Sequence, residues 1–570
     1  MKTSLNVAIR SIRAPLVMLL GVLALSGCDL LDFGGELSYE DAEKKLQSMV
    51  DDIDWEERFV QQRAKLSLDK TTSLTDTLPE IGRFPISVQA PRGGAGVVVE
   101  IFASTEKSGS DTDGWLNEVA QAFNQANVRL DNGGTARVTV RKIASGTGYE
   151  YIASGKYRPQ GFTPSNHLWG QMVEAHGIKM EVIADRLVGN IAGVVMKSDA
   201  VERMRKDYGG AEVPNLIDAV VQGNLVMGYT NPFASSTGLN FLVTVLARFS
   251  NDEPQRMLDP DVVSAFESFQ RGVPFVALTT LQMRDSVQNE GSLDAFVMEY
   301  QTFVKTPVLQ SGYDFIPFGF RHDNPLYAVG ELKPEELETL RRFAEFSRQP
   351  RFARLARDYG FDPQLQHQSS YKLPSGRLLV QAQKLWKEKK DAGRPIAALF
   401  LADVSGSMGG GRIRALKKAL LDGSEFISPG NSIGLATFSD RVRVLLPIKP
   451  FNLPHKAAFH AAVGSMDAGG NTAMYDGIAV ALNLLAQEKR KNPDVKPILF
   501  VLSDGKTNRG HVYEDMERVV RGINIPVYTI GYAAKLDELQ RVSGLVEAAN
   551  INADEGEISY KIGSMLNAQM

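Results

Sequence analysis

The stretch that most constrains the fold is an unbroken apolar run, PIAALFLAD, at residues 395–403. A strand with one buried face alternates apolar and polar residues, whereas a strand buried on both faces is continuously apolar. Such strands are typical of parallel sheets that carry helices on both sides. A second run of this kind, PILFVLSDG, covers residues 497–505. The two runs predict a doubly wound, mainly parallel α/β sheet in the last third of the chain.

Oxygen-bearing side chains stand where these runs end. Asp403 ends the first run, Ser405 and Ser407 follow it in a glycine-rich loop, and Asp504 ends the second run. Thr472 lies in another glycine-rich loop, AGGNTAMYDGI, before an expected helix. Ligands of open α/β sheets bind beyond the carboxyl ends of the strands. Hydroxyls and carboxylates, without thiolate or imidazole, suit hard cations, so the sequence predicts a Mg²⁺ or Mn²⁺ site.

With the pattern D-x-S-x-S … T … D complete, residues 395–570 resemble a von Willebrand factor type A domain with a metal-ion-dependent adhesion site. The resemblance implies that the two serine hydroxyls coordinate the cation directly. It also implies that Thr472 coordinates directly or through water, and that Asp403 and Asp504 act mostly through bound water. Domains of this family leave one coordination position for a Glu or Asp carboxylate of a bound protein.

Two other interpretations of these loops are weaker. DVSGSM alone is compatible with a turn that caps a helix, but three motifs in order favour the metal site. A hydrolytic metal site needs an activated water and a base, and these loops show no spare His, Lys or Glu. Asp467 and Asp476 flank the threonine loop and are better explained as helix caps. The chain also lacks a nucleophile elbow, a P-loop and a zinc signature, so we expect no enzyme.

The N-terminus has the pattern of an exported lipoprotein. Lys2, Arg10 and Arg13 precede an apolar run of 12 residues, APLVMLLGVLAL. That run is shorter than the ~20 residues that span a bilayer, which favours a signal peptide. It ends in LSGC, which resembles a bacterial lipobox and implies cleavage before Cys28 and diacylation of this cysteine, the chain's only one. The alternative is an ordinary signal sequence beside a buried free cysteine.

Lipid anchoring would also determine where the protein lies. Acyl chains contribute ~0.8 kcal/mol per buried CH₂, so they hold a protein on a membrane without a spanning helix. Asp29 follows Cys28 directly, and in proteobacterial lipoproteins this implies retention at the periplasmic face of the inner membrane. The formal net charge of −4 gives no indication of a nucleic-acid partner.

The rest of the chain divides at changes of pattern. Ser38 is an expected cap of a long helix-forming stretch over residues 38–66, which we expect to form a stalk or a small helical hairpin. Runs such as VVVEIF and NIAGVVM then alternate with helical stretches such as GLNFLVTVLARF, which predicts a first α/β domain with mainly parallel sheets. A lysine-rich helix, LLVQAQKLWKEKKDAG, is expected to be a connector whose lysine cluster forms a solvated face, and a lipid-binding patch is the alternative. The predicted segments are signal peptide, lipid-anchored helical stalk and linker, first α/β domain, connector and metal-site domain: residues 1–27, 28–93, 94–375, 376–394 and 395–570.

Three turns in the first α/β domain carry small polar side chains beside expected strand or helix ends. Helix N-termini offer unpaired N–H groups and the positive end of the helix dipole, so hydroxyls grouped there suit an oxyanion. Simple helix capping by serine and threonine is the usual alternative. The candidate solute-binding residues are Ser104, Thr105, Ser165, Asn166, Ser235, Ser236 and Thr237.

The order of segments in this domain resembles a type 2 periplasmic solute-binding protein. The segments are IFAS, NP..SSTG, GSLDAFVMEYQTF and DNPLYAV. The resemblance implies two lobes with a small solute between them, and a chain that enters the second lobe near VGNIAGVVM and returns after VMEYQTF. Residues that would identify a particular solute are not recognisable, so the resemblance implies a fold and no ligand.

These patterns together predict an envelope lipoprotein that binds an acidic residue of a protein partner through a divalent cation, with an attached solute-binding-like domain. The alternative is an extracytoplasmic receptor for a small solute, whose C-terminal domain couples to a transporter or a signalling complex. Stabilisation by a ligand that persists after Asp403→Ala would distinguish the second hypothesis from the first.

Overall fold

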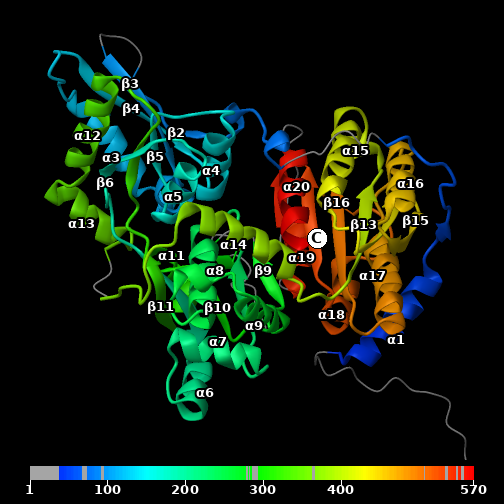
Figure 1. Cartoon of the computed structure of the whole chain (residues 1–570). Coiled ribbons are helices and arrows are strands. Elements are labelled where there is room, and N and C mark those ends of the chain that lie inside the picture. Colours follow the sequence, from blue (N-terminus) through cyan, green and yellow to red (C-terminus); the bar gives the residue numbers. More distant parts are fainter. Residues whose placement is uncertain are drawn as a thin grey trace, which may run out of the picture. The chain divides into compact units, whose positions relative to one another are not determined.

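The computed structural model of the chain is drawn in Figure 1. It describes residues 37–66, 74–91, 96–277, 280, 283–284, 293–362, 366–505, 507–532, 537–546, 550–553 and 557–570. The predicted signal peptide, Cys28 and Asp29 lie outside the described residues. Within the described ranges, no helix combines the length and the apolar character that crossing a membrane requires.

The C-terminal domain is built on a seven-stranded sheet in the order β1-β15-β14-β13-β16-β17-β18. The central strand β13 (Ile396–Asp403) pairs in parallel with β14 (Ser432–Phe438) and β16 (Lys496–Ser503). The predicted mainly parallel α/β fold is confirmed, with one antiparallel neighbour, β15, beside β14. The outer strands are β15 (Val442–Pro450), β17 (Val527–Tyr532) and β18 (Asn550–Ala553).

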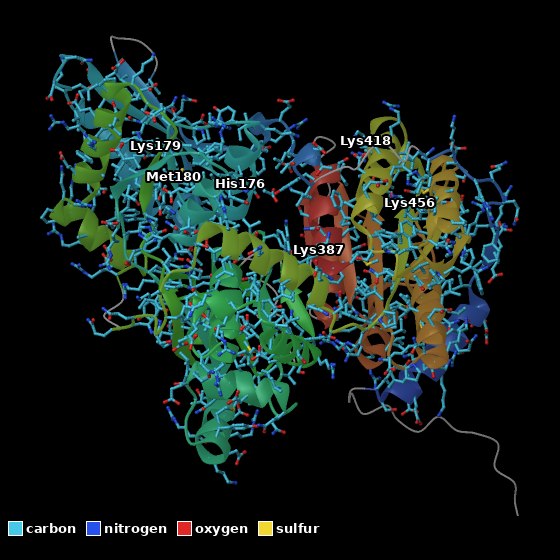
Figure 2. All side chains as sticks on the ribbon, in the orientation of Figure 1. His176, Lys179, Met180, Lys387, Lys418 and Lys456 are labelled. Atoms are coloured by element: carbon cyan, nitrogen blue, oxygen red, sulfur yellow. The ribbon has the colours of Figure 1, made fainter. Side chains whose placement is uncertain are left out.

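Helices cover both faces of this sheet, which explains why its central run is apolar throughout. Side chains alternate along a strand, so Ala398 and Phe400 pack on one helical layer while Leu399 and Leu401 pack on the other. Figure 2 shows Lys418 and Lys456 on two helices of the first layer. The first layer consists of α15 (Gly411–Gly423), α16 (Leu453–Gly464) and α20 (Ile558–Gln569). The second contains α17 (Met474–Lys491), α18 (Tyr513–Ile523) and α19 (Asp537–Ser543).

The expected stalk is part of this C-terminal domain. Ser38 caps α1 (Tyr39–Asp52) as predicted, since its Oγ accepts the backbone N–H of Asp41 at 3.2 Å. The helix ends at Asp52, however, and β1 (Trp55–Glu57) adds a parallel strand to β15. The apolar side of α1 packs in the same core as α17 and α18. The prediction of a helical stalk or small helical hairpin over residues 38–66 is therefore wrong, because this segment covers the sheet and extends its edge.

The first lobe of the preceding domain contains a six-stranded sheet in the order β2-β4-β3-β5-β12-β6. β3 (Gly96–Ala103) is parallel to both β4 (Thr135–Lys142) and β5 (Gly161–Thr163). β2 (Ile86–Val88) pairs antiparallel with β4, so the lobe begins upstream of the predicted boundary at residue 94. The other elements are α3 (Trp115–Ala126), α4 (Ser145–Ser154), α5 (Leu168–Glu174), β6 (Met180–Ala184), β12 (Leu326–Val329), α12 (Pro334–Ser347) and α13 (Pro350–Asp358).

The second lobe contains a five-stranded sheet in the order β11-β7-β10-β8-β9. The chain enters this lobe with β7 (Ile191–Lys197), near the predicted VGNIAGVVM segment. It returns only after β11 (Tyr313–Arg321), later than the resemblance implied, because β11 pairs antiparallel with β7 at the sheet edge. The other elements are α6 (Ser198–Tyr208), α7 (Val213–Val221), β8 (Met227–Thr230), α8 (Ser236–Phe249), α9 (Pro260–Arg271), β9 (Phe275–Ala277), β10 (Ala295–Glu299) and α11 (Tyr300–Val304).

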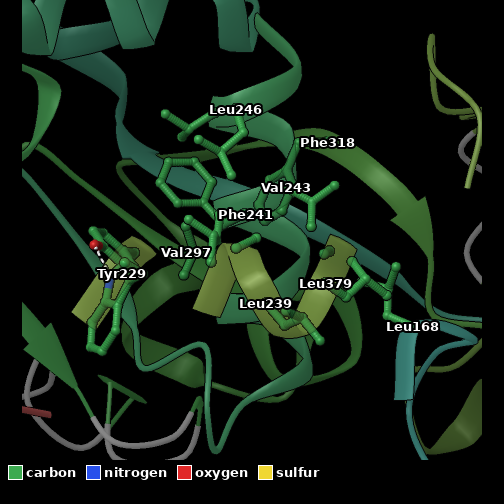
Figure 3. Packing of buried hydrophobic residues seen from close by; sticks show 14 of the residues in the cluster. Leu168, Tyr229, Leu239, Phe241, Val243, Leu246, Val297, Phe318 and Leu379 are labelled. Atoms are coloured by element: carbon green, nitrogen blue, oxygen red, sulfur yellow. Dashed lines mark hydrogen bonds between the residues drawn. The ribbon is translucent and has the colours of Figure 1, made fainter. Parts of the chain in front are cut away.

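The expected connector helix, α14 (Gly376–Lys389), packs into the core of the lobed domain. Figure 3 shows Leu379 of α14 in the same cluster as Leu168 and Leu239. Trp386 is fully buried and donates its indole N–H to the hydroxyl of Tyr229 at 2.5 Å. The helix is thus part of the lobed domain, because one of its faces is apolar and packs against α5, α8 and α9. The predicted solvated lysine face is present only in part, since Lys384 is exposed whereas Lys390 is buried.

Candidate functional site

Asp403 is the last residue of β13 and is completely buried. Its Oδ1 accepts the backbone N–H of Ser405 at 2.8 Å, and its Oδ2 accepts the hydroxyl of Ser503 at 2.6 Å. Burial raises the pKa of Asp403 above its ordinary value, and the nearby charge of Asp504 adds to the rise. Both oxygens are thus oriented by donors, one from the loop after β13 and one from the neighbouring strand β16.

The two predicted serine ligands lie side by side in the loop after β13. The Oγ atoms of Ser405 and Ser407 are 3.1 Å apart, and the Ser407 hydroxyl donates to Oδ1 of Asp504 at 2.9 Å. Asp504 directly follows β16, the neighbour of β13 in the sheet. Four of the five predicted ligands therefore form one chain of hydrogen bonds at the carboxyl edge of two adjacent strands.

Thr472 lies on a neighbouring loop, which is hydrogen-bonded to the loop that carries Ser405 and Ser407. The backbone N–H of Gly406 donates to the carbonyl oxygen of Gly470 at 3.0 Å, and the N–H of Thr472 donates to Asn508 Oδ1 at 2.8 Å. Gly470 has φ +85°, and a Cβ there would lie 2.2 Å from Oδ2 of Asp440, so glycine is favoured in this turn. The structure therefore brings together three loops that carry all five predicted ligands.

The donor set fits a hard divalent cation. It consists of three hydroxyls and two carboxylates, and oxygen donors of this kind suit Mg²⁺ or Mn²⁺. In the described part of the chain, no group of three or more His, Cys, Asp or Glu side chains could hold a metal ion. This site differs from such groups because its hydroxyls, Ser405, Ser407 and Thr472, supply most of its donors.

Three residues at this edge of the sheet were not predicted from the sequence. Ser503, one residue before Asp504, donates to Asp403 across the sheet. Arg412, in the first turn of α15, donates from Nη1 to Asp504 Oδ2 at 2.7 Å. The loop between β16 and α18 also contains His511, contrary to the expectation of no imidazole there. Its Nδ1 lies 2.7 Å from Oδ1 of Asp476, which also accepts the His511 backbone N–H.

The seven candidate solute-binding residues gather where the two lobes meet. Four of them line a cavity of about 30 Å³, together with Glu106 and Glu299. A space of this size holds about one water molecule. The four lining residues are Thr105, Ser165, Ser235 and Ser236. The other three, Ser104, Asn166 and Thr237, are buried and contact Glu106, His322 and Glu299 respectively.

Ionisable side chains that the sequence analysis did not single out surround this cavity. Lys107 is fully buried and donates to Ser104 Oγ, to Asn324 Oδ1 at 2.9 Å and to Glu106 Oε1 at 3.5 Å. Burial lowers the pKa of Lys107. Burial opposes ionisation of Glu106, but Lys107 and hydrogen bonds outweigh it and lower the pKa of this carboxyl.

Glu299, at the end of β10 in the second lobe, is a further buried carboxyl at the lobe junction. Its Oε1 lies 2.8 Å from Nδ1 of His322, and its Oε2 accepts Nδ2–H of Asn190 at 2.9 Å. Burial, followed by the charge of Glu106, raises the pKa of Glu299. The polar groups at the lobe junction are therefore paired with one another, which suits closed lobes with little room for a solute.

A larger cavity, of about 710 Å³, lies elsewhere in the lobed domain. Arg248 of α8, Phe318 of β11 and the buried Tyr371 are among its lining residues. His367 also lines it and contacts the carbonyl oxygen of Gly319 through Nε2 at 2.9 Å. None of the seven candidate solute-binding residues lines this cavity.

The fold and the site define a class of protein: a doubly wound α/β domain with hydroxyl and carboxylate donors at its carboxyl edge, preceded by a two-lobed α/β domain. Residues 399–559 match the family profile of the von Willebrand factor type A domain. The C-terminal region therefore contains such a domain, as the sequence pattern predicts.

Known proteins resemble separate parts of the chain. Inter-alpha-trypsin inhibitor heavy chain H1 of Mesocricetus auratus is 28% identical over 151 residues, which are 24% of this chain and 16% of the relative. A von Willebrand factor type A structure from Catenulispora acidiphila covers 30% of this chain and 42% of its own, with 20% identity and a TM-score of 0.28. The structure of a periplasmic thiamin binding protein covers 54% of this chain and 99% of its own, with 12% identity and a TM-score of 0.38. The chain spans only 16–17% of the length of the curated relatives it matches.

Proposed function

We propose that this chain is a lipid-anchored envelope protein that captures an acidic side chain of a protein partner through Mg²⁺ or Mn²⁺. The observation that carries the proposal is the hydrogen-bonded cluster of Asp403, Ser405, Ser407 and Asp504, with Thr472 on the adjoining loop. A membrane location is proposed from the N-terminal sequence pattern alone.

The site's own residues suit capture of an anion. The Ser405 and Ser407 hydroxyls are neutral donors. Both carboxylate oxygens of Asp403 already accept hydrogen bonds, from the Ser503 hydroxyl and from the backbone N–H of Ser405. A bound cation would supply an open coordination position for a carboxylate oxygen of the partner. Direct coordination by neutral hydroxyls leaves much of the cation's charge uncompensated, so the site attracts a further anion.

We propose a binding protein and not an enzyme. The imidazole of His511, a candidate base in the loop after Asp504, lies 2.7 Å from a carboxylate oxygen of Asp476. Asp403 accepts two hydrogen bonds and is completely buried, so it is poorly placed to take a proton from a solvent-exposed substrate.

Capture from periplasmic and membrane extracts tests this function. The purified chain, Asp403→Ala and the control Asp494→Ala are each exposed to extract in Mg²⁺ and in EDTA, and retained proteins are identified by mass spectrometry. Asp494 is exposed and lies outside the site. We expect a protein retained by the unmodified chain and the control in Mg²⁺, and lost in EDTA and in Asp403→Ala. The same retained proteins in all samples would refute metal-dependent capture.

A second function, reception of a small solute, is supported by the candidate residues around the cavity between the lobes. Because that cavity is only about 30 Å³, a solute larger than water would require the lobes to open. A thermal-shift screen of anions, sugars and amino acids tests this function. A ligand at 100 times its Kd stabilises the folded state by about 2.7 kcal/mol, and this shift should persist in Asp403→Ala. A screen without any stabilising compound would count against reception.

A further inference from the structure

Arg412 is a cationic side chain built into the rim of the proposed metal site. Its Nη1 donates to Asp504 Oδ2 at 2.7 Å and to the backbone carbonyl oxygen of Ser407 at 3.2 Å. Among the described residues, it is the only cationic side chain that contacts any of the five predicted ligands. The sequence pattern of the site does not include this position.

Asp504 connects the guanidinium to the proposed ligands. One carboxylate oxygen of Asp504 accepts the Ser407 hydroxyl at 2.9 Å while the other accepts Arg412. The carboxylate is nearly buried, with 8% of its side chain exposed, whereas 39% of the Arg412 side chain is exposed. Both printed contacts of the guanidinium run through Nη1, and more than a third of the side chain is exposed, so a partner in solvent can reach this side chain.

A fixed positive charge has two opposite effects at such a place. It repels a divalent cation, and it already neutralises part of the charge of Asp504, so it weakens cation binding. It also attracts anions, and a guanidinium can bind a carboxylate through two parallel N–H donors. The same residue therefore disfavours the cation alone and favours the cation together with an acidic partner.

We propose that Arg412 is a specificity determinant of the site, which selects a partner segment with two neighbouring acidic side chains, one for the cation and one for the guanidinium. This inference rests on the proposed metal-dependent capture and names the chemistry of its partner. The neutral variant Arg412→Gln should then bind the cation more tightly and lose its preference for paired acids.

The first test is a calorimetric titration of the purified full chain with Mn²⁺ alone. We expect Arg412→Gln to bind Mn²⁺ roughly three- to tenfold more tightly than the unmodified chain, and Arg412→Lys, which keeps the charge, to shift far less. Arg414→Gln is the matched control, because Arg414 lies on the same helix and is exposed. Equal Mn²⁺ affinity in Arg412→Gln and the unmodified chain would overturn the proposed role of Arg412 and leave the metal site in place. No Mn²⁺ binding by any of these proteins would overturn the metal site itself.

The second test uses two fluorescent peptides in a Gly-Ser background, one with a single aspartate and one with two adjacent aspartates. Fluorescence anisotropy is measured in saturating Mn²⁺. We expect the unmodified chain and Arg414→Gln to bind the two-aspartate peptide at least several-fold more tightly, and Arg412→Gln to bind both peptides alike. Equal binding of both peptides by the unmodified chain, or binding of neither, would overturn the selection of paired acids.

Discussion

At the scale of single residues, His455 ties α16 to the sheet that carries the site. Its Nε2–H donates to the carbonyl oxygen of Ile433 in β14 at 2.7 Å, and its ring packs edge-on against Phe451. Burial lowers the pKa of His455 because an imidazolium loses hydration there; the Ile433 carbonyl opposes this effect, and the charge of Lys449 adds to it.

This burial predicts acid sensitivity of the C-terminal domain. The folded-state pKa of His455 lies below the unfolded value of 6.5, so the unfolded chain takes up a proton first as pH falls. We expect the free energy of unfolding to decrease from about pH 6.5 downward, through the folded-state pKa. Urea unfolding at several pH values measures the slope, which should be shallower in His455→Gln. His460 and His367, whose pKa values burial also lowers, contribute to the slope that remains. Identical slopes in both proteins would contradict the assignment to His455.

At the scale of elements, the lobe junction is held by ionisable groups from separate segments. Glu106 and Lys107 lie on α2 (Thr105–Ser108), Glu299 ends β10, and His322 follows β11. Their side chains are buried and hydrogen-bonded in two pairs, Lys107 with Glu106 and His322 with Glu299. Removing one partner of such a group costs more than removing a matched pair, because it leaves an uncompensated buried charge.

A double-mutant comparison tests this network. We expect Lys107→Met to lower the free energy of unfolding by about 3 kcal/mol, because Glu106 then remains buried without its cation. Glu106→Gln combined with Lys107→Met should recover much of that loss, since the charge and its partner leave together. Urea unfolding followed by circular dichroism measures Lys107→Met, Glu106→Gln and the double variant, and Lys206→Met is an exposed control on α6. A double variant as unstable as the sum of its single variants would exclude coupling.

Local pattern predicted some elements well and others poorly. β3, β7, β13 and β16 arise from apolar runs that any tertiary context would bury, so their existence was predictable. Short strands such as β5 and β12 carry too few residues to show a period, and they exist because a neighbour pairs with them. The early end of α1 has the same cause, since β1 forms only beside β15.

At the scale of the whole molecule, the proposed function requires attachment to a membrane through the N-terminus. The proposed anchor is Cys28, which follows the signal-peptide pattern. Two or more acyl chains on that residue would retain the chain on a membrane, because a single chain gives only reversible binding.

Substitution of the cysteine tests this attachment. We expect the unmodified chain, expressed in a Gram-negative host, to incorporate labelled palmitate and to sediment with membranes. Cys28→Ser should lose the label and move to the soluble fraction, because no acyl chain remains to partition into lipid. A labelled Cys28→Ser protein, or an unmodified chain without label, would contradict lipid anchoring.

The sequence by itself determined the nature of the C-terminal sheet and the five donors at its edge. Continuous apolar runs specify burial on both faces, and the donors stand at fixed places relative to these strands and the glycine loops around them. Only the tertiary structure decided which other side chains join them. Ser503 reaches Asp403 from the neighbouring strand, and Arg412 reaches Asp504 from a helix 92 positions away in sequence. Such contacts depend on the pairing of strands and the packing of helices, which no local spacing encodes.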